Sequence, residues 1–592
     1  MRTPAARFED IPGRLPEATI PDGTDRASVG ETAISKLNNL KQDDLASFAI
    51  WRDLLSLTDT FRTFYSAEKV FSTLSRLRHD KQCSNFRLNS ENEARRIDVL
   101  DTSWLEFDVT FTIKDGHLVG NGAGIVSVML DGDHWKIWML RTWLENYEGH
   151  GHPDDASATS NSVTNGHAED VVYEAAIVGG GQSGLAVAGR LTALGIPNIL
   201  FDSRPAIGDS WAHRYDSLKW HTIKEYGNMP LGRTFDEDDP DMVPVKRIAS
   251  AYKAWATKHN LNIREGTSID KAVWDSSSQT WSVTASTASS INTWKARNLV
   301  LAIGPGQTTP VSPSWASPSD IKSSGFRGTI IHSANYHNVN TFHSQHGVVI
   351  GTANTAHDIA EDMANAQMSV TMVQRSPTFI FPGEWLAKTQ AKDYHRGQPN
   401  EIPDRRQLTN PLKISREMTN RNVHHLIKQN PKRFDDLEKA GFKVDRFGDL
   451  ATNLQIRFGG HYIDTGSCQR IIDGEIKVKA VPVRGLTSEG LLFEDGTEVK
   501  ADLIVLATGY NHDFRPDAAK IVGHDIAEQM DDYYGPDAEG ELRGYARLAG
   551  HPKLYYAGGE VRTSRFFSRF VALQIQKEAL GEPLRPYLEG RR

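Results

Sequence analysis

The spacing of apolar side chains divides the first part of the chain into two differently patterned stretches. Over residues 33–77 apolar residues recur mostly at intervals of three and four, which predicts helices. Over residues 107–145 apolar and polar positions alternate, and Asp-Gly pairs at 115–116 and 131–132 interrupt them, which predicts an antiparallel meander. Helices followed by a curved meander predict a small α+β domain over residues 31–148.

Two segments without this periodicity flank the predicted domain. Residues 1–30 are rich in Pro, Asp, Gly and Arg and predict a flexible leader. Residues 149–170 carry almost no large apolar side chain and predict a linker. Three histidines of this segment, His150, His152 and His167, are more typical of a solvated linker than of a metal site. We therefore expect no metal.

From residue 171 onward, short apolar strands alternate with helical segments, as in α/β proteins with parallel sheets. Two of these strands run directly into glycine-containing turns, at 179 and 351, and helices follow. This duplication predicts two Rossmann-type dinucleotide-binding domains after the α+β domain. We expect the first to combine residues 171–345 with 460–592, and the second to span 346–459 with an insertion.

The first turn has the G-x-G-x-x-G pattern, with Gly179, Gly181 and Gly184 between a strand and a helix. These glycines permit a tight turn, close approach of a pyrophosphate and close packing of helix on strand. Ser183 lies in the first turn of that helix, where free N–H groups attract phosphates. Asp202 ends the next strand, where its carboxylate would accept hydrogen bonds from a ribose. Both FAD and NAD have such a ribose, so the motif alone does not choose between them.

The second turn departs from the glycine pattern. Gly351 is followed by Asn354 and Thr355, but Ala353 and Ala356 occupy the second and third glycine positions. Alanine still allows a helix to pack closely on a strand, whereas at the second position it narrows the space for a pyrophosphate. The turn remains a candidate second dinucleotide site.

The strand that follows the second turn ends in Arg375 and Ser376 instead of an acid. A guanidinium at this position can bind the 2′-phosphate of NADP through two hydrogen bonds. The sequence therefore favours NADP over NAD in the second site.

Size and charge limit the function classes. The 592 residues exceed a single domain, and the net charge of −8 argues against a general affinity for nucleic acid or anionic membranes. The two cysteines, Cys83 and Cys468, form no C-x-x-C pair, which argues against a disulfide reductase. No signal-peptide pattern and no apolar stretch of about 20 residues is present. We expect a cytoplasmic protein.

Six further motifs surround the two turns. They are GDSW from Gly208 to Trp211, LKWH ending at His221, AIG ending at Gly304, FxGxxxHxxxY around His332, LATGY around Gly509 and LYYAG ending at Gly558. Their order resembles that of the class B flavoprotein monooxygenases, which include flavin-containing, YUCCA-type and Baeyer–Villiger enzymes. The resemblance spans residues 173–576. Two departures are His337, where the family usually has a basic residue, and Ile303, where it has Thr.

The resemblance implies FAD in the first site and NADPH in the second. It further implies that O2 forms a C4a-(hydro)peroxyflavin, which oxygenates a small organic substrate. The additional cofactor-contacting positions that it implies are Gly208, Trp211, Gly304, His332, Gly509 and Gly558. His221 stands where YUCCA-type enzymes also have His. It is the candidate catalytic residue, as a hydrogen-bond donor to the flavin or its peroxide.

The N-terminal α+β domain resembles the nuclear transport factor 2-like (SnoaL-like) superfamily, in its helices and in the strands over residues 124–145. That resemblance implies a small-molecule pocket or a dimerisation module, so a homodimer through this domain is one expectation.

The type of oxygenation stays open. The fingerprint ends in Tyr336 instead of the Trp typical of Baeyer–Villiger enzymes, which favours N- or S-oxygenation or hydroxylation. The LKWH segment favours the alternative, YUCCA-like oxidative decarboxylation of a 2-oxo acid or Baeyer–Villiger oxidation of a carbonyl compound. A non-catalytic nucleotide-binding module is a third alternative, because the second turn is imperfect. We expect the substrate to contact residues 379–460.

Overall fold

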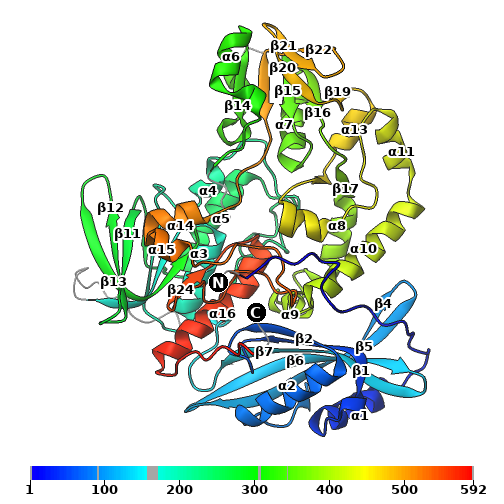
Figure 1. Ribbon diagram of the computed structural model, residues 1–592, viewed down its shortest axis with the longest axis vertical. Helices are drawn as coiled ribbons and strands as arrows, with labels where there is room; N and C mark the ends of the chain where they lie inside the picture. Colours follow the sequence, from blue (N-terminus) through cyan, green and yellow to red (C-terminus); the bar gives the residue numbers. More distant parts are fainter. Residues whose placement is uncertain (1–2, 90–92, 157–170, 305–308, 343–344, 590–592) are drawn as a thin grey trace.

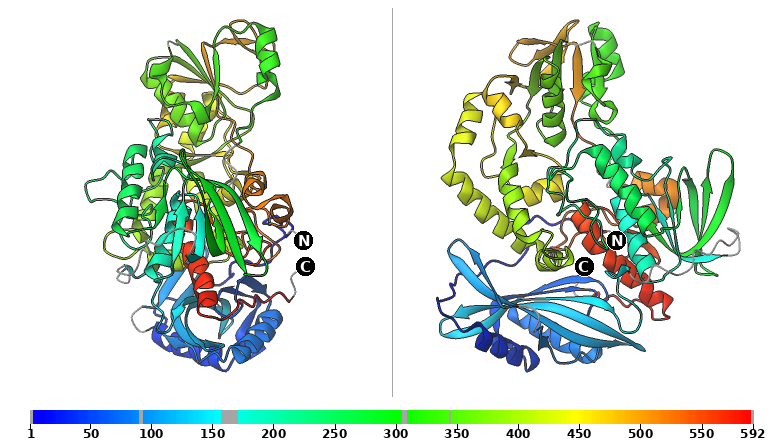
Figure 2. Two further views of the ribbon diagram at one scale, coloured as in Figure 1. Left: turned by 90° about the vertical axis from the view of Figure 1, so that its left-hand side faces the viewer. Right: turned by 180° about the vertical axis from the view of Figure 1, so that it is seen from behind.

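The computed structural model describes residues 3–89, 93–156, 171–304, 309–342 and 345–589. Figure 1 shows three parts: an N-terminal sheet with its helices, a central α/β domain and a second α/β domain farthest from the N-terminal sheet. Both views in Figure 2 show the same order along the long axis. Among the described residues, no helix is long and apolar enough to span a membrane.

The N-terminal part is an α+β domain, as predicted. Its elements are α1 Arg26–Asn38, β1 Leu45–Leu54, β2 Phe61–Tyr65, α2 Ala67–Asp80, β3 Arg87–Leu88, β4 Arg95–Val99, β5 Thr102–Asp115, β6 Leu118–Asp131 and β7 His134–Tyr147. The strand order is β2-β1-β7-β6-β5-β3, and β4 also pairs with β5. The resemblance to SnoaL-like proteins stays a prediction.

The prediction of helices throughout residues 33–77 was wrong in its middle. Residues Leu45–Leu54 form strand β1, which pairs in parallel with β7 and antiparallel with β2. Most of β1 is buried on both faces of the sheet, so its apolar residues do not alternate with polar ones. A doubly buried strand and a helix cannot be told apart by periodicity alone.

The predicted flexible leader is also corrected by the structure. Phe8, Ile11, Leu15 and Ile20 are buried, each with at most 3% of its surface exposed. The segment lies between the N-terminal sheet and the helical insertion: Thr102 donates a hydrogen bond to the carbonyl oxygen of Pro16, and Lys413 donates one to that of Phe8. Its Pro and Gly content reflects an irregular but packed path.

The central domain contains the first glycine turn. Its elements are β8 Val172–Val178, α3 Gln182–Ala193, β9 Asn198–Phe201, α4 Asp209–Ala212, α5 Val245–Lys258, β10 Ile263–Arg264, β11 Ser268–Asp275, β12 Thr280–Ser286, β13 Ile291–Leu301, α14 Arg515–Val522, α15 His524–Ala527, β24 Leu554–Tyr556 and α16 Val561–Ala579. The strand order is β10-β9-β8-β13-β12-β11, and β24 pairs with β13. Strands β10, β9, β8, β13 and β24 are parallel neighbours.

The second α/β domain contains the second turn. Its elements are α6 Pro318–Ser324, β14 Thr329–His332, β15 His346–Ile350, α7 Asn354–Asn365, β16 Ser369–Val373, β19 Ile476–Lys479, β20 Val483–Leu486, β21 Gly490–Phe493, β22 Glu498–Lys500 and β23 Leu503–Leu506. The main sheet is parallel, in the order β14-β23-β15-β16-β19. The predicted limits of 346–459 were therefore too narrow, because β14, β19 and β23 lie outside them and pair within this sheet.

The insertion after β16 is mostly helical. It contains β17 Phe379–Pro382, α8 Gly383–Asp393, α9 Glu401–Leu408, α10 Leu412–Gln429, α11 Lys432–Lys439, α12 Leu450–Thr452, β18 His461–Asp464 and α13 Ser467–Ile472. Figure 1 shows α9 on the side of the N-terminal sheet opposite α2. A hydrogen bond supports this contact: the Arg141 side chain of β7 donates to the backbone carbonyl oxygen of Arg406 in α9 at 2.8 Å.

The N-terminal domain is fastened to the rest of the chain and is not a separate module. Arg52 of β1 forms a buried ion pair with Glu541 through two hydrogen bonds. Lys577 of α16 forms an ion pair with Asp59 at 2.7 Å. Of the predicted linker, residues 157–170 lie outside the described residues. In its described part Asp154 is largely buried and paired with Arg190, so this part is anchored to the central domain although several of its residues are exposed.

Candidate functional site

The first glycine turn has the geometry that its motif predicts. Gly179 has a φ of +109°, and a Cβ there would lie 2.4 Å from the carbonyl oxygen of Ala302. A Cβ on Gly184 would lie 1.9 Å from the carbonyl oxygen of Gly179. The fold itself therefore requires glycine at both positions, because helix α3 packs directly on the end of β8.

Gly181 differs from its neighbours because no protein atom requires a glycine there. Its backbone is extended, with φ −75° and ψ −178°, and a Cβ would meet nothing within 4 Å. Gly181 caps α3 without a side-chain hydrogen bond, so N–H groups of the first helical turn face open space. An anionic group such as a pyrophosphate fits this combination of space and donors.

Asp202 and Ser183 occupy the two sides of this turn. The buried Asp202 carboxylate accepts hydrogen bonds from the backbone N–H of Gly180 at 2.6 Å and of Arg204 at 2.7 Å. A carboxylate has about four acceptor sites, so Asp202 keeps capacity for ribose hydroxyls. The Ser183 hydroxyl instead lies 2.8 Å from that of Ser564 in α16, which makes Ser183 a contact between helices.

Three predicted glycines lie at one edge of the central sheet. Gly179, Gly304 and Gly558 follow the carboxyl ends of β8, β13 and β24, which are parallel neighbours. Ligands of open α/β sheets bind at such an edge. The Tyr556 hydroxyl donates a hydrogen bond to the carbonyl oxygen of Gly304, which joins two of these segments.

Gly208 and Trp211 belong to one short segment, in which Gly208 precedes helix α4 and Trp211 lies within it. Gly208 has a φ of +96°, and a Cβ there would lie 2.4 Å from the carbonyl oxygen of Ala249. The partly buried Trp211 indole packs against the apolar cores of both domains and against Trp220. Trp211 is therefore placed between the two domains, and its predicted contact with the flavin stays a prediction.

The second turn repeats the strand–turn–helix geometry. Gly351 has a φ of +129°, and a Cβ there would lie 2.5 Å from the carbonyl oxygen of Ala507. Ala356 is buried, so alanine serves the close packing of α7. The Asn354 side chain accepts a hydrogen bond from the backbone N–H of Ile463 at 2.9 Å, while the partly buried Thr355 lies beside it.

Arg375 and Ser376 follow β16 and are exposed. Over the described part of the chain, the Arg375 guanidinium has no hydrogen bond or ion pair. The adjacent Gln374 is buried and bonded to Lys443 and Thr378, so the backbone that carries Arg375 is fixed. A guanidinium that has no described partner and follows the fixed end of a strand is suited to bind a phosphate group.

His332 joins the fingerprint segment to the LATGY segment. Its Nδ1 accepts a hydrogen bond from the N–H of Ala334 at 3.1 Å, so Nε2 carries the proton and donates to the carbonyl oxygen of Gly509 at 3.1 Å. Burial lowers the pKa of His332, which favours this neutral form. His332 thus holds Gly509, whose φ is +80°, at the end of β23.

His221 connects the two nucleotide domains. Its Nε2 lies 3.2 Å from the Asp358 carboxylate, and the Tyr215 hydroxyl donates to the other oxygen of Asp358 at 2.7 Å. Asp358 belongs to α7, the helix that follows the second turn. His221 therefore contacts the helix that follows the second turn, and its predicted contact with the flavin stays a prediction. Tyr215 and Asp358 were not among the predicted site residues.

Comparisons with known proteins agree with this geometry. Residues 173–525 match the family "Flavin-binding monooxygenase-like". The chain belongs to this family. The match confirms the predicted family, enzyme class and flavin.

Individual relatives are distant. The chain is 28% identical over 347 residues to the indole-3-pyruvate monooxygenase YUCCA1 of rice, covering 58% of this chain and 78% of the relative. It is 26% identical over 339 residues to the probable indole-3-pyruvate monooxygenase YUCCA10 of Arabidopsis thaliana, covering 56% and 80%. Among solved structures, a flavin-containing monooxygenase from Stenotrophomonas maltophilia has a TM-score of 0.46 at 15% identity, covering 69% of this chain and 99% of that chain. An oxidized steroid monooxygenase bound to NADP has a TM-score of 0.47 at 17% identity, covering 71% and 86%.

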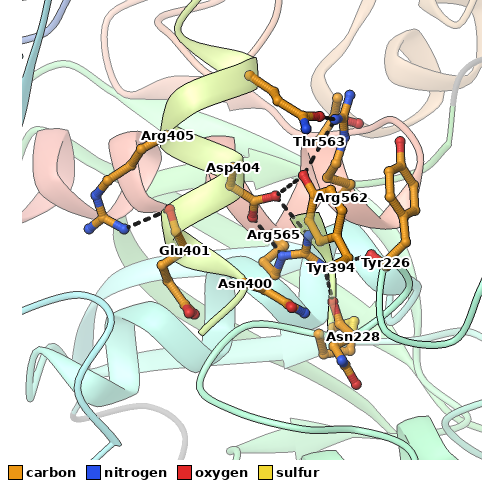
Figure 3. Close-up of polar contacts among 12 residues, drawn as sticks. Tyr226, Asn228, Tyr394, Asn400, Glu401, Asp404, Arg405, Arg562, Thr563 and Arg565 are labelled. Atoms are coloured by element: carbon orange, nitrogen blue, oxygen red, sulfur yellow. Dashed lines mark hydrogen bonds and ion pairs between the residues drawn. The ribbon is translucent and has the colours of Figure 1, made fainter. Parts of the chain in front are cut away.

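A buried polar cluster holds α9 of this flavin-binding monooxygenase against α16 (Figure 3). Arg565 and Asp404 form an ion pair with 0% and 1% side-chain exposure, through hydrogen bonds of 2.7 and 2.8 Å. Arg565 also donates to the carbonyl oxygen of Tyr226 at 2.9 Å and to that of Asn228. The Tyr394 hydroxyl donates to Asp404 at 2.9 Å. The cluster ties the insertion to the helix that begins after Gly558.

One group of possible metal ligands occurs in the described part of the monooxygenase, formed by Glu145, His152 and Asp154. Arg405 donates to Glu145 at 2.7 Å and to Asp154 at 2.7 Å, and Arg190 also pairs with Asp154. Burial alone would raise the pKa of Asp154, but the surrounding arginines lower it below its usual value. The carboxylates are thus neutralised by guanidinium groups, which would repel a metal cation.

Two buried histidines beside the second turn were not predicted as site residues. His357 stacks on Tyr462 with ring centroids 3.6 Å apart, and its Nδ1 lies 2.8 Å from the Ser467 hydroxyl. Burial, together with the charge of His221, lowers the pKa of His357 to about 3. Burial also lowers the pKa of His461 to about 4. The sequence signal available for His357 was its position in the helix directly after the second turn.

We expect His357 to make the enzyme less stable in acid. Its pKa is near 6.5 in an unfolded chain and about 3 in the folded one, so only the unfolded chain gains a proton between these values. The contribution of His357 to the free energy of unfolding is largest above pH 6.5. It decreases as the pH falls, by about 2 kcal/mol between pH 7 and pH 5. His357→Phe keeps the ring stacking and should reduce proton uptake on unfolding at pH 5 by about one. Urea unfolding at both pH values measures this, and parallel pH dependence of variant and wild type would contradict it.

Proposed function

We propose that the protein is an FAD-dependent monooxygenase that uses NADPH and O2 to oxygenate a small organic substrate. FAD would bind at the first turn and NADPH at the second. The observation that carries this proposal is the contact between the two sites: Tyr215 and His221 of the first domain both bond to Asp358 in the helix of the second turn. Two dinucleotide sites that share a contact can place a nicotinamide beside a flavin.

Bound FAD would supply the chemistry of hydride acceptance and O2 activation. The chain's own contribution is binding and orientation. The free N–H groups of α3 beside Gly181 would hold the pyrophosphate, and the Asp202 carboxylate would accept hydrogen bonds from the ribose. His332 fixes Gly509, and Trp211 closes the contact between the domains. Asp358 holds Nε2 of His221, which sets the ring plane and leaves Nδ1 as its second polar atom.

The substrate class has two candidates. N- or S-oxygenation or hydroxylation is the first, in keeping with Tyr336 in the fingerprint. Oxidative decarboxylation of a 2-oxo acid, or Baeyer–Villiger oxidation, is the second. The similarity to indole-3-pyruvate monooxygenases and His221 in the LKWH segment support this second candidate.

Anaerobic addition of NADPH or NADH to the purified enzyme, followed by O2, tests the function. NADPH should bleach the flavin absorbance, and O2 should then restore it. Incubation with a thioether, an amine, a ketone and a 2-oxo acid identifies the reaction, since oxygen insertion adds one oxygen atom and decarboxylation also releases CO2. A purified protein that holds no flavin and takes up none when FAD is added would overturn the proposal.

Arg375 is expected to select NADPH over NADH. Because an exposed guanidinium–phosphate contact is lost, Arg375→Gln should raise the KM for NADPH about tenfold and leave that for NADH nearly unchanged. Arg484→Gln is a matched control, since Arg484 is an exposed arginine of the same domain with no described ion pair. Steady-state kinetics with both nucleotides measure the change, and an equal loss with NADH would contradict this role of Arg375.

Location and assembly are further proposals. The net charge and the two cysteines support a cytoplasmic enzyme without a nucleic-acid partner. A homodimer through the N-terminal domain would have to use α1, α2 or the sheet edges, because α9 covers the other face of the sheet. Analytical ultracentrifugation of the full chain decides whether it forms.

A further inference from the structure

A cavity of about 190 Å³ lies between the N-terminal sheet and α9 of the insertion. Residues of β5, β6 and β7 form one wall, and residues of α9 form the other. Its apolar lining residues are Val109, Ala123, Ile125, Trp143 and Ile402. None of its lining residues belongs to either glycine turn. The cavity is therefore a separate space from the two nucleotide sites.

The carboxylates at this cavity already have cationic partners. Asp108 accepts two hydrogen bonds from Arg95, at 2.9 and 2.7 Å. Glu145 accepts two from Arg405, at 2.7 and 2.6 Å. Each carboxylate is thus paired with at least one guanidinium group, so neither is available to an entering cation.

Arg406 is the exception among the charged lining residues. Its backbone oxygen accepts from Arg141, which fixes its position on α9. Its guanidinium has no hydrogen bond or ion pair to any described residue, and its Nε is inaccessible to solvent. Burial, and secondarily the charge of Arg95, lowers the pKa of Arg406. Burying part of a cation without a hydrogen-bonding partner costs folding free energy, and a bound anion would offset this cost.

We propose that this cavity binds a small organic anion, with its carboxylate on Arg406 and its apolar body against Trp143, Ile125 and Ala123. An apolar cavity of about 150 Å³ holds benzene, so this one has room for a single-ring carboxylate. A guanidinium accepts a planar carboxylate through two parallel hydrogen bonds. The proposal does not depend on where FAD and NADPH bind.

The position of the cavity gives the ligand a contact with the catalytic part of the chain. Ile402, Arg405 and Arg406 lie on α9, and Asp404 of the same helix is held by Arg565 of α16 (Figure 3). The bound anion would thus touch the N-terminal sheet and a helix that is anchored to the flavin domain. This makes it an accessory ligand of the assembled enzyme and not of the N-terminal domain alone.

Titration of the flavin-loaded enzyme with benzoate, phenylacetate and 2-naphthoate tests the proposal, with benzamide as the uncharged counterpart. Tryptophan fluorescence and calorimetry report binding, since Trp143 lines the cavity. We expect at least one carboxylate to bind with a Kd of about 1 mM or lower and benzamide to bind at least about tenfold more weakly. Absence of binding by all three carboxylates, or equal binding of benzamide, would overturn the proposal.

Two variants locate the binding. Arg406→Gln removes the charge and should weaken carboxylate binding about tenfold or more. Ala123→Leu fills the cavity and should weaken it similarly. Arg87→Gln is the control, because Arg87 is an exposed arginine of β3 with no described partner. Melting temperature and flavin content check that each variant is folded. Unchanged binding by both Arg406→Gln and Ala123→Leu places the ligand elsewhere and rejects this site, while the proposed monooxygenase function would still stand.

Discussion

Replacing Gly181 with valine is expected to give a folded protein that has lost its flavin. No protein atom lies within 4 Å of a Cβ at this position, and its φ of −75° is open to any residue. The folded chain alone does not need glycine there. A pyrophosphate at the N-terminus of α3 does, because a side chain would occupy its space. We expect the ratio of bound FAD to protein to fall at least about tenfold, which costs about 1.4 kcal/mol or more of binding free energy.

Absorbance spectra of the purified variant and thermal unfolding of its flavin-free form measure the two effects. Gly485→Val is the matched control: Gly485 also has open space around its Cβ and no positive φ, but it lies in a small sheet of the second domain. Gly184→Val should behave differently and lower the folding stability itself, because its Cβ would lie 1.9 Å from a backbone oxygen. A Gly181→Val protein that keeps stoichiometric FAD would show that the flavin does not bind at this turn.

Local patterns explain why the nucleotide turns could be predicted from the sequence. The strand before each turn, the glycines and the helix after it are consecutive in the chain, so a short window contains the whole motif. The strands that lead into the two turns are confirmed as β8 and β15. The two-Rossmann architecture is likewise confirmed.

Features that depend on distant partners could not be predicted. Strand β1 has neighbours on both sides, one of them β7 about 90 residues later, so its burial pattern has no period of two. The second domain recruits β23 from beyond the insertion, and nothing in a local window shows this. Arg52 and Glu541 are 489 residues apart in sequence, yet their ion pair fixes the N-terminal domain. Arg406 has no described partner, and this property is visible only in the fold.

Asp404→Ala is expected to destabilise the contact between the insertion and the flavin domain by about 3–5 kcal/mol, the usual cost of removing one partner of a buried ion pair. Asp404 and Arg565 are 1% and 0% exposed, so the remaining Arg565 guanidinium would stay buried without a carboxylate. Its bonds to the carbonyl oxygens of Tyr226 and Asn228 do not neutralise its charge. Urea unfolding, monitored by the release of flavin, measures the loss of stability.

A double replacement separates the ion pair from simple packing. Asp404→Leu combined with Arg565→Met removes both charges and should recover most of the stability, because buried pairs and apolar residues of similar volume are often equivalent. Asp436→Ala is the surface control, since Asp436 pairs with Lys432 and Lys439 in solvent and should show no measurable change. If Asp404→Ala unfolds at the wild-type urea concentration, α9 is held by other contacts. The helix would then be held by contacts such as the hydrogen bond from Arg52 to the carbonyl oxygen of Leu408, at 2.8 Å.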